Sequence, residues 1–297
     1  MDIDFPLNSS KKAIKYLIAL NVLKSYPLSV IRVEGLSRTF KRSIKEPGFK
    51  GALQNLFNRK YAQKDAVKNI NFHLEEGSFT GLVGANGAGK TTLLKLCSGL
   101  LHPTHGKITV LGFTPAERDP QFLKNIGLVM GQKSQLWADL SPRDSLELFA
   151  SIYDIPPETY KTRVAEYCKL FNVTQLLGVQ VRRLSLGERM KFELIAALLH
   201  QPKMLFLDEP TIGLDLLAKE SVRNFLKTEL KKRKITVILS SHDMEDIQEV
   251  CEKLMIIAQG ELKYFGSLKE FSSQDRIFKQ SVLNLITDVP NNGDRPL

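Results

Sequence analysis

Residues 84–91 read GANGAGKT, and this stretch decides the fold. It matches the pattern G-x-x-x-x-G-K-[ST], in which a glycine-rich loop joins a β-strand to an α-helix. The glycines at positions 84, 87 and 89 let backbone N–H groups turn toward phosphate oxygens, and the positive end of the following helix points at the same oxygens. The apolar run FTGLVG before the loop and TLLKL after it supply the strand and the helix. The sequence therefore predicts a phosphate-binding loop.

The loop and the two residues after its lysine supply the candidate phosphate ligands. These are Gly84, Ala85, Asn86, Gly87, Ala88, Gly89, Lys90, Thr91 and Thr92. Lys90 is expected to reach the β- and γ-phosphates, and the Thr91 hydroxyl is expected to ligate Mg²⁺. An ordinary glycine-rich turn before a helix is the alternative, and the strand, loop and helix found together here argue against it.

A second motif, MLFLDEP, occupies residues 204–210 and contains two adjacent acids. Its apolar part predicts a buried parallel strand, and ligand sites of such sheets lie at the carboxyl ends of the strands. Asp208 is then placed to hold Mg²⁺ through a water, and Glu209 to polarise the attacking water. The alternative is that these two acids are solvated turn residues, as adjacent acids after a strand often are. The presence of a phosphate loop in the same chain argues against this alternative.

A third strand, ITVILSS, ends at His242. A single histidine is more often structural than catalytic. Because this one follows a strand of the same expected sheet, it is a candidate to hydrogen-bond the γ-phosphate or to orient the attacking water.

The composition sets the class of protein. Of 297 residues, 43% are hydrophobic and 25% are charged, which argues against disorder and against a collagen-like chain. The net charge of +10 favours an anionic partner: a nucleotide, a nucleic acid or an acidic membrane surface.

The three cysteines are widely spaced, so neither a disulfide framework nor a metal site is expected. No apolar run approaches the roughly 20 residues of a membrane span. Asp2, Asp4 and Lys15 are unsuited to a signal peptide, so we expect the chain in the cytoplasm.

The order of elements predicts an α/β fold. Strands separated by helices indicate a mostly parallel sheet, preceded by a β-rich N-terminal part. Residues from about 133 to 200 have mainly helical periodicity and are expected to form an inserted helical subdomain. The stretch 254–265 predicts a terminal hairpin. Residues 1–29 are expected to form an extension with one short amphipathic helix near 11–24, docked on the main domain or lying on a membrane surface. The tail 269–297 is expected to fray from about residue 272.

Residues 38–64 form a basic stretch with eight basic residues and one acidic residue. Pro47, Gly48 and Gly51 predict turns within it. We regard 41–64 as an insertion, either a solvated loop or a surface attracted to anionic lipid headgroups or to an acidic partner.

Together, GANGAGKTT, LSLGE, LFLDEPTIGLD and SSHD resemble the ATP-binding cassette of ABC transporters, and the resemblance covers roughly residues 30–268. It implies a P-loop ATPase that binds ATP and Mg²⁺ and works as a head-to-tail dimer. Each ATP would lie between the phosphate loop of one subunit and the LSLGE motif of the other. Ser185, Gly187 and Glu188 would then contact ATP bound to the partner, and Asp215 would cross the interface.

The resemblance implies two further contacts. Gln132 is similar to the glutamine that contacts Mg²⁺ or the lytic water and senses the transport subunit, with Gln135 as a less favoured candidate. An aromatic side chain upstream of the loop would stack on adenine. Tyr61 has the spacing typical of the family, and Phe40 is the rival.

The chain departs from the usual LSGGQ signature in two places. Leu186 replaces a glycine and needs room beside the nucleotide, and Glu188 replaces the glutamine. Glu188 would accept a hydrogen bond from ribose, or repel the γ-phosphate if it lay too near. The variant resembles that of bacterial exporter-type ATPases.

The leading hypothesis is an ATP-hydrolysing subunit of an ABC exporter. It would work as a homodimer or with a closely related subunit, and would be peripheral on the inner face of the cell membrane. Separate transmembrane permease subunits would contact residues 133–200, with Leu136 and Trp137 as candidates and a core role open for Trp137. A soluble ABC ATPase acting on ribosomes or nucleic acid is the alternative, which the lack of a tandem cassette or long coiled coil disfavours. A module that binds ATP without hydrolysis is disfavoured by Glu209.

Overall fold

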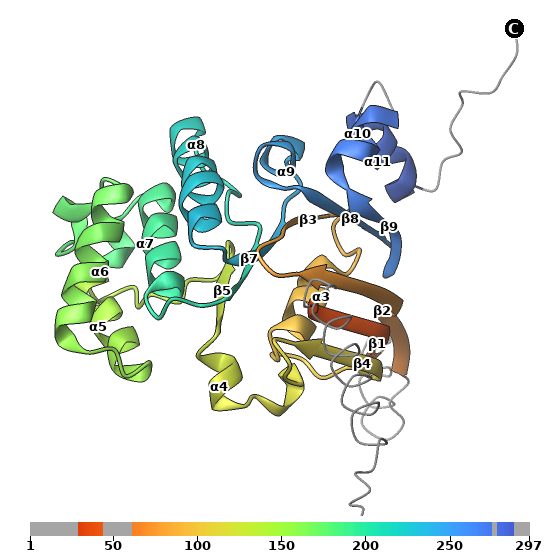
Figure 1. Cartoon of the computed structure of the whole chain (residues 1–297), viewed down its shortest axis with the longest axis horizontal. Helices are drawn as coiled ribbons and strands as arrows, with labels where there is room; N and C mark the ends of the chain where they lie inside the picture. The colour runs from red at the N-terminus through yellow and green to blue at the C-terminus, as the bar shows by residue number, and fades with distance from the viewer. Residues whose placement is uncertain (1–28, 44–60, 275–277, 288–297) are drawn as a thin grey trace, which may run out of the picture.

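The structure is a computed structural model that describes residues 29–43, 61–274 and 278–287. Its centre is a six-stranded sheet with the order β5-β6-β7-β3-β8-β9 (Figure 1). Neighbouring strands pair in parallel except β8 and β9, which form the antiparallel hairpin at the edge. The strands are β3 (Phe79–Val83), β5 (Ile126–Met130), β6 (Met204–Asp208), β7 (Thr236–Ser240), β8 (Lys253–Ala258) and β9 (Glu261–Ser267). The predicted mostly parallel sheet and terminal hairpin are confirmed.

The central strands are apolar because both faces of the sheet are covered. All five residues of β3 and of β7 are buried, as are the first four of β6. Strands buried on both faces require continuous apolar sequence rather than alternation. Since these strands are parallel, the loops at their carboxyl ends meet at one edge of the sheet.

A second, antiparallel sheet has the order β2-β1-β4, with β1 at Ser29–Ser43, β2 at Tyr61–Glu75 and β4 at His105–Val110. It provides the expected β-rich N-terminal part. Within the basic stretch, the alternative of a solvated loop is wrong for residues 38–43 and 61–64, because β1 and β2 pair as far as Ser43 opposite Tyr61. Residues 44–60, which include the turns predicted at Pro47, Gly48 and Gly51, lie outside the described residues. The helix expected near 11–24 lies outside them as well.

Helix α3 (Lys90–Cys97) follows the phosphate loop and lies between the two sheets (Figure 1). Four of its side chains are buried in one core cluster with residues of both sheets; they are Leu93, Leu94, Leu96 and Cys97. Full burial of one such apolar side chain contributes about 1.5–3 kcal/mol, so this packing fixes the direction of the helix and therefore of the loop before it.

The predicted helical subdomain is present as α5 (Pro142–Ile152), α6 (Pro157–Leu170) and α7 (Leu186–Leu198), which stand apart from the antiparallel sheet (Figure 1). The short helix α4 (Pro120–Leu123) precedes β5. Among the described residues, 3-10 turns lie at Pro115–Glu117, Thr174–Leu176 and Val181–Arg183. Leu136 is buried, so its proposed docking role is wrong, whereas Trp137 is 44% exposed and packs on Phe149 with ring centroids 5.8 Å apart.

The C-terminal helices are α8 (Leu216–Phe225), which continues as a π-helical turn at Leu226–Leu230, α9 (Met244–Val250), α10 (Leu268–Gln274) and α11 (Phe278–Thr287). The predicted fraying from about residue 272 is wrong for α11, because Val282 on this helix is buried in the core. Among the residues that the structure describes, no helix combines the length and apolar character needed to cross a membrane.

Candidate nucleotide-binding site

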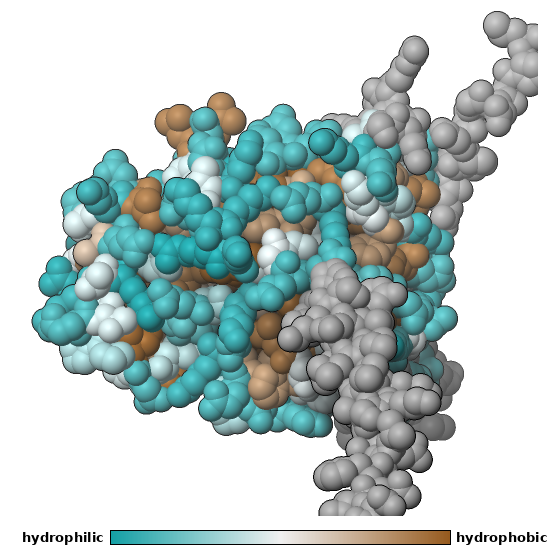
Figure 2. Space-filling model, viewed as in Figure 1, coloured by the Kyte–Doolittle hydropathy of each residue, from teal (hydrophilic) through white to brown (hydrophobic). Residues whose placement is uncertain are grey.

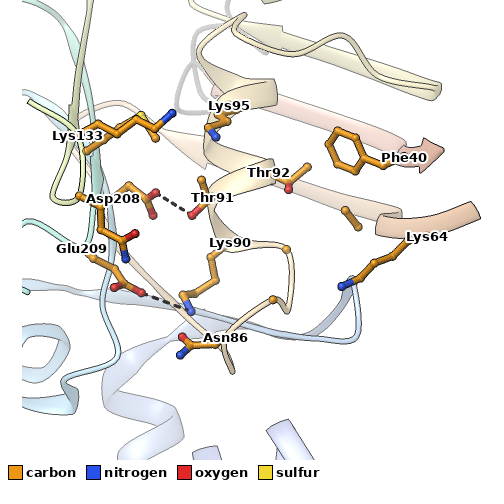
Figure 3. A pocket seen from close by; sticks show the side chains of 15 residues that line it. Phe40, Lys64, Asn86, Lys90, Thr91, Thr92, Lys95, Lys133, Asp208 and Glu209 are labelled. Carbon is orange, nitrogen blue, oxygen red and sulfur yellow. Dashed lines mark hydrogen bonds and ion pairs between the residues drawn. The ribbon is translucent and has the colours of Figure 1, made fainter. Parts of the chain in front are cut away.

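A cavity of about 470 Å³ opens at the carboxyl edge of the parallel sheet. It is lined by the phosphate loop and α3, by Asp208 and Glu209 at the end of β6, by Gln132 after β5, and by Phe40 and Lys64 of the antiparallel sheet (Figure 3). This volume is typical of small-molecule sites. Segments far apart in sequence therefore meet around one cavity.

The glycine-rich loop has the conformation that phosphate binding requires. Gly89 has a φ of +115°, and a Cβ there would lie 2.3 Å from the carbonyl oxygen of Ala66, so no other residue fits. The Lys90 side chain is buried within the loop, where its Nζ donates to the carbonyl oxygens of Gly84 (2.8 Å) and Ala85 (3.3 Å). The loop thus holds the lysine ammonium beside its own backbone.

Asp208 is held by two hydroxyl groups. Thr91 Oγ1 donates to Asp208 Oδ2 at 2.7 Å, and Ser240 Oγ donates to Asp208 Oδ1 at 2.7 Å. The same Ser240 hydroxyl accepts a hydrogen bond of 3.0 Å from the backbone N–H of Glu209. Ser240 therefore holds the Asp208 carboxylate and the backbone of Glu209. The sequence analysis missed it, although its position as the last residue of β7 places it at this edge.

Glu209 lies between two cationic or ionisable groups. Lys90 Nζ is 3.8 Å from Glu209 Oε1, and His242 Nδ1 is 3.5 Å from Glu209 Oε2. The Glu209 side chain is largely buried, whereas His242 is exposed. The Nδ1 atom of the exposed histidine therefore lies close to the Glu209 carboxylate.

A buried acid fixes the backbone next to His242. Asp246 accepts hydrogen bonds from Ser241 Oγ (2.7 Å) and Thr211 Oγ1 (2.5 Å), and from Arg223 Nε at 2.6 Å. Asp246 therefore ties the strand end before His242 to the segment after Glu209. Sequence reasoning missed it as well, because its partners come from three separate segments.

Gln132 lines the cavity, and Gln135 does not. Gln132 approaches the acids because its neighbour is Gly131. A Cβ at position 131 would lie 2.1 Å from the carbonyl oxygen of Glu209. Gln135 instead donates from Nε2 to the carbonyl oxygen of Leu128 at 2.6 Å. Of the two glutamines, Gln132 is the one near the acids.

The charges around the cavity suit a polyanion that brings a divalent cation. Four lysines line it, and they are Lys64, Lys90, Lys95 and Lys133. They stand against two carboxylates, Asp208 and Glu209, so the walls carry an excess of positive charge. The Phe40 ring forms part of the wall across from the acids (Figure 3). The Tyr61 side chain is outside the described residues.

The signature residues do not line the cavity of their own chain. Ser185 and Glu188 form a reciprocal cap of α7, in which Glu188 Oε2 accepts from Ser185 N at 2.8 Å. Asp215 Oδ1 caps α8 by accepting from Ala218 N at 2.8 Å, and Gly187 packs closely against Ala218. The Glu188 carboxylate is thus hydrogen-bonded at the start of its own helix. One expectation from the sequence was that it would instead accept a hydrogen bond from ribose.

The strand, glycine-rich loop, buried lysine and paired acids define a P-loop nucleoside-triphosphate-binding protein of the α/β class. The ABC transporter family matches residues 67–212 of the chain. The chain is 33% identical to the ABC transporter ATP-binding protein NatA of Bacillus subtilis over 211 residues, 71% of this chain and 85% of that protein. It therefore belongs to the ABC transporter family as an ATP-binding subunit, and it hydrolyses ATP in support of transport.

Other relatives and solved structures agree with this family. The bacitracin transport ATP-binding protein BcrA of Bacillus licheniformis is 33% identical over 202 residues, which is 68% of this chain and 65% of that protein. The linearmycin resistance ATP-binding protein LnrL of Bacillus subtilis is 32% identical over 214 residues, 72% of this chain and 68% of that protein. A solved ATP-binding subunit of an ABC transporter has a TM-score of 0.70 at 23% identity and covers 89% of this chain and 100% of its own. That likeness confirms the fold. The alternative of an ATPase acting on ribosomes or nucleic acid receives no support.

Proposed function

We propose that this subunit drives an exporter, and that two copies enclose each ATP between the phosphate loop of one and the Ser185–Glu188 motif of the other. The observation that carries the proposal is the cluster of Lys90, Thr91, Asp208 and Glu209 at one end of β6, facing a cavity with cationic walls. Every group needed to hold and cleave a triphosphate, apart from those assigned to the second copy, is present there.

In this proposal the loop amides and Lys90 bind the β- and γ-phosphates, with Thr92 beside them. Thr91, Asp208 and Gln132 would hold Mg²⁺. The hydroxyl and carboxylate oxygens fit, since Thr91 Oγ1 and Asp208 Oδ2 lie 2.7 Å apart and Mg²⁺ is usually held by one or two carboxylates together with phosphate and water. When bound, Mg²⁺ neutralises charge on the phosphates.

Glu209 is assigned as the general base. It accepts a proton from the water whose oxygen attacks the γ-phosphorus, while the bond from phosphorus to the bridging oxygen breaks and its electrons remain on ADP. The position of His242 Nδ1, 3.5 Å from Glu209 Oε2, supports a role in orienting this water or contacting the γ-phosphate.

Two observations support a second copy as the source of the remaining contacts. Ser185, Gly187, Glu188 and Asp215 are absent from the lining of the cavity in their own chain. Leu216 and Leu217, the first two residues of α8, are 72% and 77% exposed. Figure 2 shows an apolar protrusion over this helix. Such large exposed leucines favour burial against a partner.

Phe40 is favoured for stacking on adenine because it lines the cavity. Tyr61 remains the alternative. Phe40→Ala should weaken ATP binding by about tenfold, as expected for loss of one stacking contact of about 1–3 kcal/mol. An equal loss in Tyr61→Ala, with none in Phe40→Ala, would assign the role to Tyr61.

A membrane permease is proposed to cover the exposed apolar side chains beside the helical subdomain. They are Leu100, Trp137, Leu148 and Ile152. Leu100 and Ile152 line one groove together with Gln135, whose segment leads to Gln132. Contact with this groove would place the subunit on the inner face of the membrane. The names of the bacitracin and linearmycin relatives support export.

Attraction of the basic stretch to anionic lipid is proposed as a further contact. Lys41→Gln and Arg42→Gln, introduced together, should weaken binding to vesicles that contain anionic lipid, and more strongly at low salt. Equal binding by the double variant at low salt would reject the contact.

Glu209→Gln tests the proposed function. It should lower phosphate release by roughly 10²–10⁴-fold while ATP binding survives, because only the base is lost. It should also accumulate as an ATP-bound dimer, measured by light scattering with Mg²⁺ and ATP. Normal turnover would remove Glu209 from the mechanism, and a variant that binds ATP but stays monomeric would overturn the dimer.

A further inference from the structure

Helix α7, whose first residues belong to the LSLGE motif, carries a buried acid eight residues after Ser185. Glu193 is 2% exposed. Within the described part of the chain, the hydrogen bonds to its carboxylate all come from residues 134–136. Ser134 Oγ donates to Oε1 at 2.5 Å, Gln135 N to Oε1 and Oε2 at 3.0 and 3.1 Å, and Leu136 N to Oε1 at 3.4 Å.

Burial of this carboxyl raises its pKa, and the hydrogen bonds from Ser134, Gln135 and Leu136 act in the opposite direction. A buried acid is unfavourable unless such donors surround it. A leucine would fill the same interior without that cost. The donors are therefore the reason an acid is useful here, and all of them belong to the segment that follows Gln132.

The other end of this segment is fixed to the sheet. Gly131 N donates to the carbonyl oxygen of Asp208 at 2.8 Å, and Gln135 Nε2 donates to the carbonyl oxygen of Leu128 in β5 at 2.6 Å. We call residues 131–136 the Gln132 segment. It is bonded on one side to the strand that ends in the Mg²⁺-binding acid and on the other side to α7.

We propose that Glu193 is a positioning residue that joins the Gln132 segment to α7, so that a displacement of Gln132 by bound ATP moves Ser185 with it. Glu193 lies about 12 Å along α7 from Ser185, from a rise of 1.5 Å per residue, and rigid secondary elements carry coupling between sites. The inference rests on the proposed function, because it assigns Ser185 to the ATP of the second copy. It adds the residue that links the two sites.

The test compares two neutral replacements of similar size. Glu193→Gln keeps a carbonyl oxygen that can accept the bonds now made to Oε1, whereas Glu193→Leu fills the space and accepts none. Both are placed in the Glu209→Gln background. ATP binding is measured with a fluorescent ATP analogue, and ATP-driven dimerisation is measured by light scattering.

Glu193→Leu should weaken ATP-driven dimerisation by about tenfold or more, within the 5–150-fold range of typical coupling between sites, and leave binding of the analogue within about twofold. Glu193→Gln should restore most of the dimerisation. Ser134→Ala, which removes one of the bonds, should show a smaller loss of the same sign. If Glu193→Leu does not fold, Ser134→Ala and Glu193→Gln still decide the question.

Val164→Ala is the matched control. Val164 is buried in the same subdomain on α6, so its truncation lowers the unfolding temperature without removing a bond to the Gln132 segment. It should dimerise normally. Equal dimerisation by Glu193→Leu and Val164→Ala, or equal losses in Glu193→Gln and Glu193→Leu, would overturn the proposal. Failure of Glu209→Gln alone to dimerise would instead contradict the proposed function.

Discussion

Ser240→Ala removes a hydroxyl that contacts the Asp208 carboxylate and the backbone N–H of Glu209. Ser240 is fully buried at the end of β7, donates to Asp208 Oδ1 at 2.7 Å and accepts from Glu209 N at 3.0 Å. The variant leaves the strand unchanged and deletes these two bonds. It therefore tests whether the geometry of the acids depends on this residue.

The structure gives the expected size of the effect. A hydrogen bond to a charged group contributes about 1.5–3 kcal/mol, and one between neutral groups about 0.5–1.5 kcal/mol. Glu209 N also donates to the Ser240 carbonyl oxygen at 3.1 Å, a bond that the variant keeps, so the loss comes mainly from the bond to Asp208. The free energy of unfolding should thus fall by about 1.5–3 kcal/mol, nearer the lower value because Asp208 is only partly buried and water can replace the lost donor. If a loss of about 1.4–2.8 kcal/mol also reaches the transition state, kcat falls by about 10–100-fold.

The assay is phosphate release over a range of ATP and Mg²⁺ concentrations, with urea unfolding of the same samples. Thr80→Val is the control, since Thr80 is a fully buried residue of the neighbouring strand whose Oγ1 has no hydrogen-bond partner among the described residues. Its loss should cost little. If Ser240→Ala matches Thr80→Val in both kcat and unfolding free energy, Ser240 does not orient the acids.

Three further results are expected. Lys90→Ala should abolish ATP binding measured by calorimetry, while Lys95→Ala, at the outer wall, should weaken it only severalfold; normal kinetics in Lys90→Ala would count against the phosphate loop. Burial acts to raise the pKa of Asp243, but its bonds to Lys219 and Glu245 N and the charge of Arg223 lower it below the ordinary 3.8. The Asp243 contribution to stability is therefore present above that value and lost as pH falls through the lowered pKa. Urea unfolding should show that Lys219→Met is less stable than the unchanged chain at pH 7 and that this difference shrinks toward pH 3; a constant difference would contradict the pairing. Burial raises the pKa of every cysteine thiol, to about 12 for Cys97 and about 11 for Cys168. A thiol reagent at pH 8 should therefore modify none before urea is added, and fast reaction of the native protein would refute their burial.

Local sequence determined much of this protein. The phosphate loop, the buried strands ending in Asp208 and Ser240, and the helical block are each encoded by neighbouring residues. Their side-chain periodicity and glycine content restrict the backbone directly. For the same reason the edge of the sheet where the acids lie was predictable, because carboxyl ends of parallel strands meet there.

Tertiary structure alone decided which side chains support the site. Three contacts join segments tens to more than a hundred residues apart. They are the bridge from Ser240 to the Asp208 carboxylate and Glu209 N, the bonds that residues 134–136 donate to Glu193, and the entry of Phe40 into the cavity wall. The packing of α11 on the core is also tertiary, since Val282 is buried there, whereas the helix itself has a local signal in the spacing of the apolar residues of FKQSVLNLIT. Hydrogen bonds and packing act over a few ångströms in space, so a chain in which these partners are distant in sequence gives no local signal of their contact.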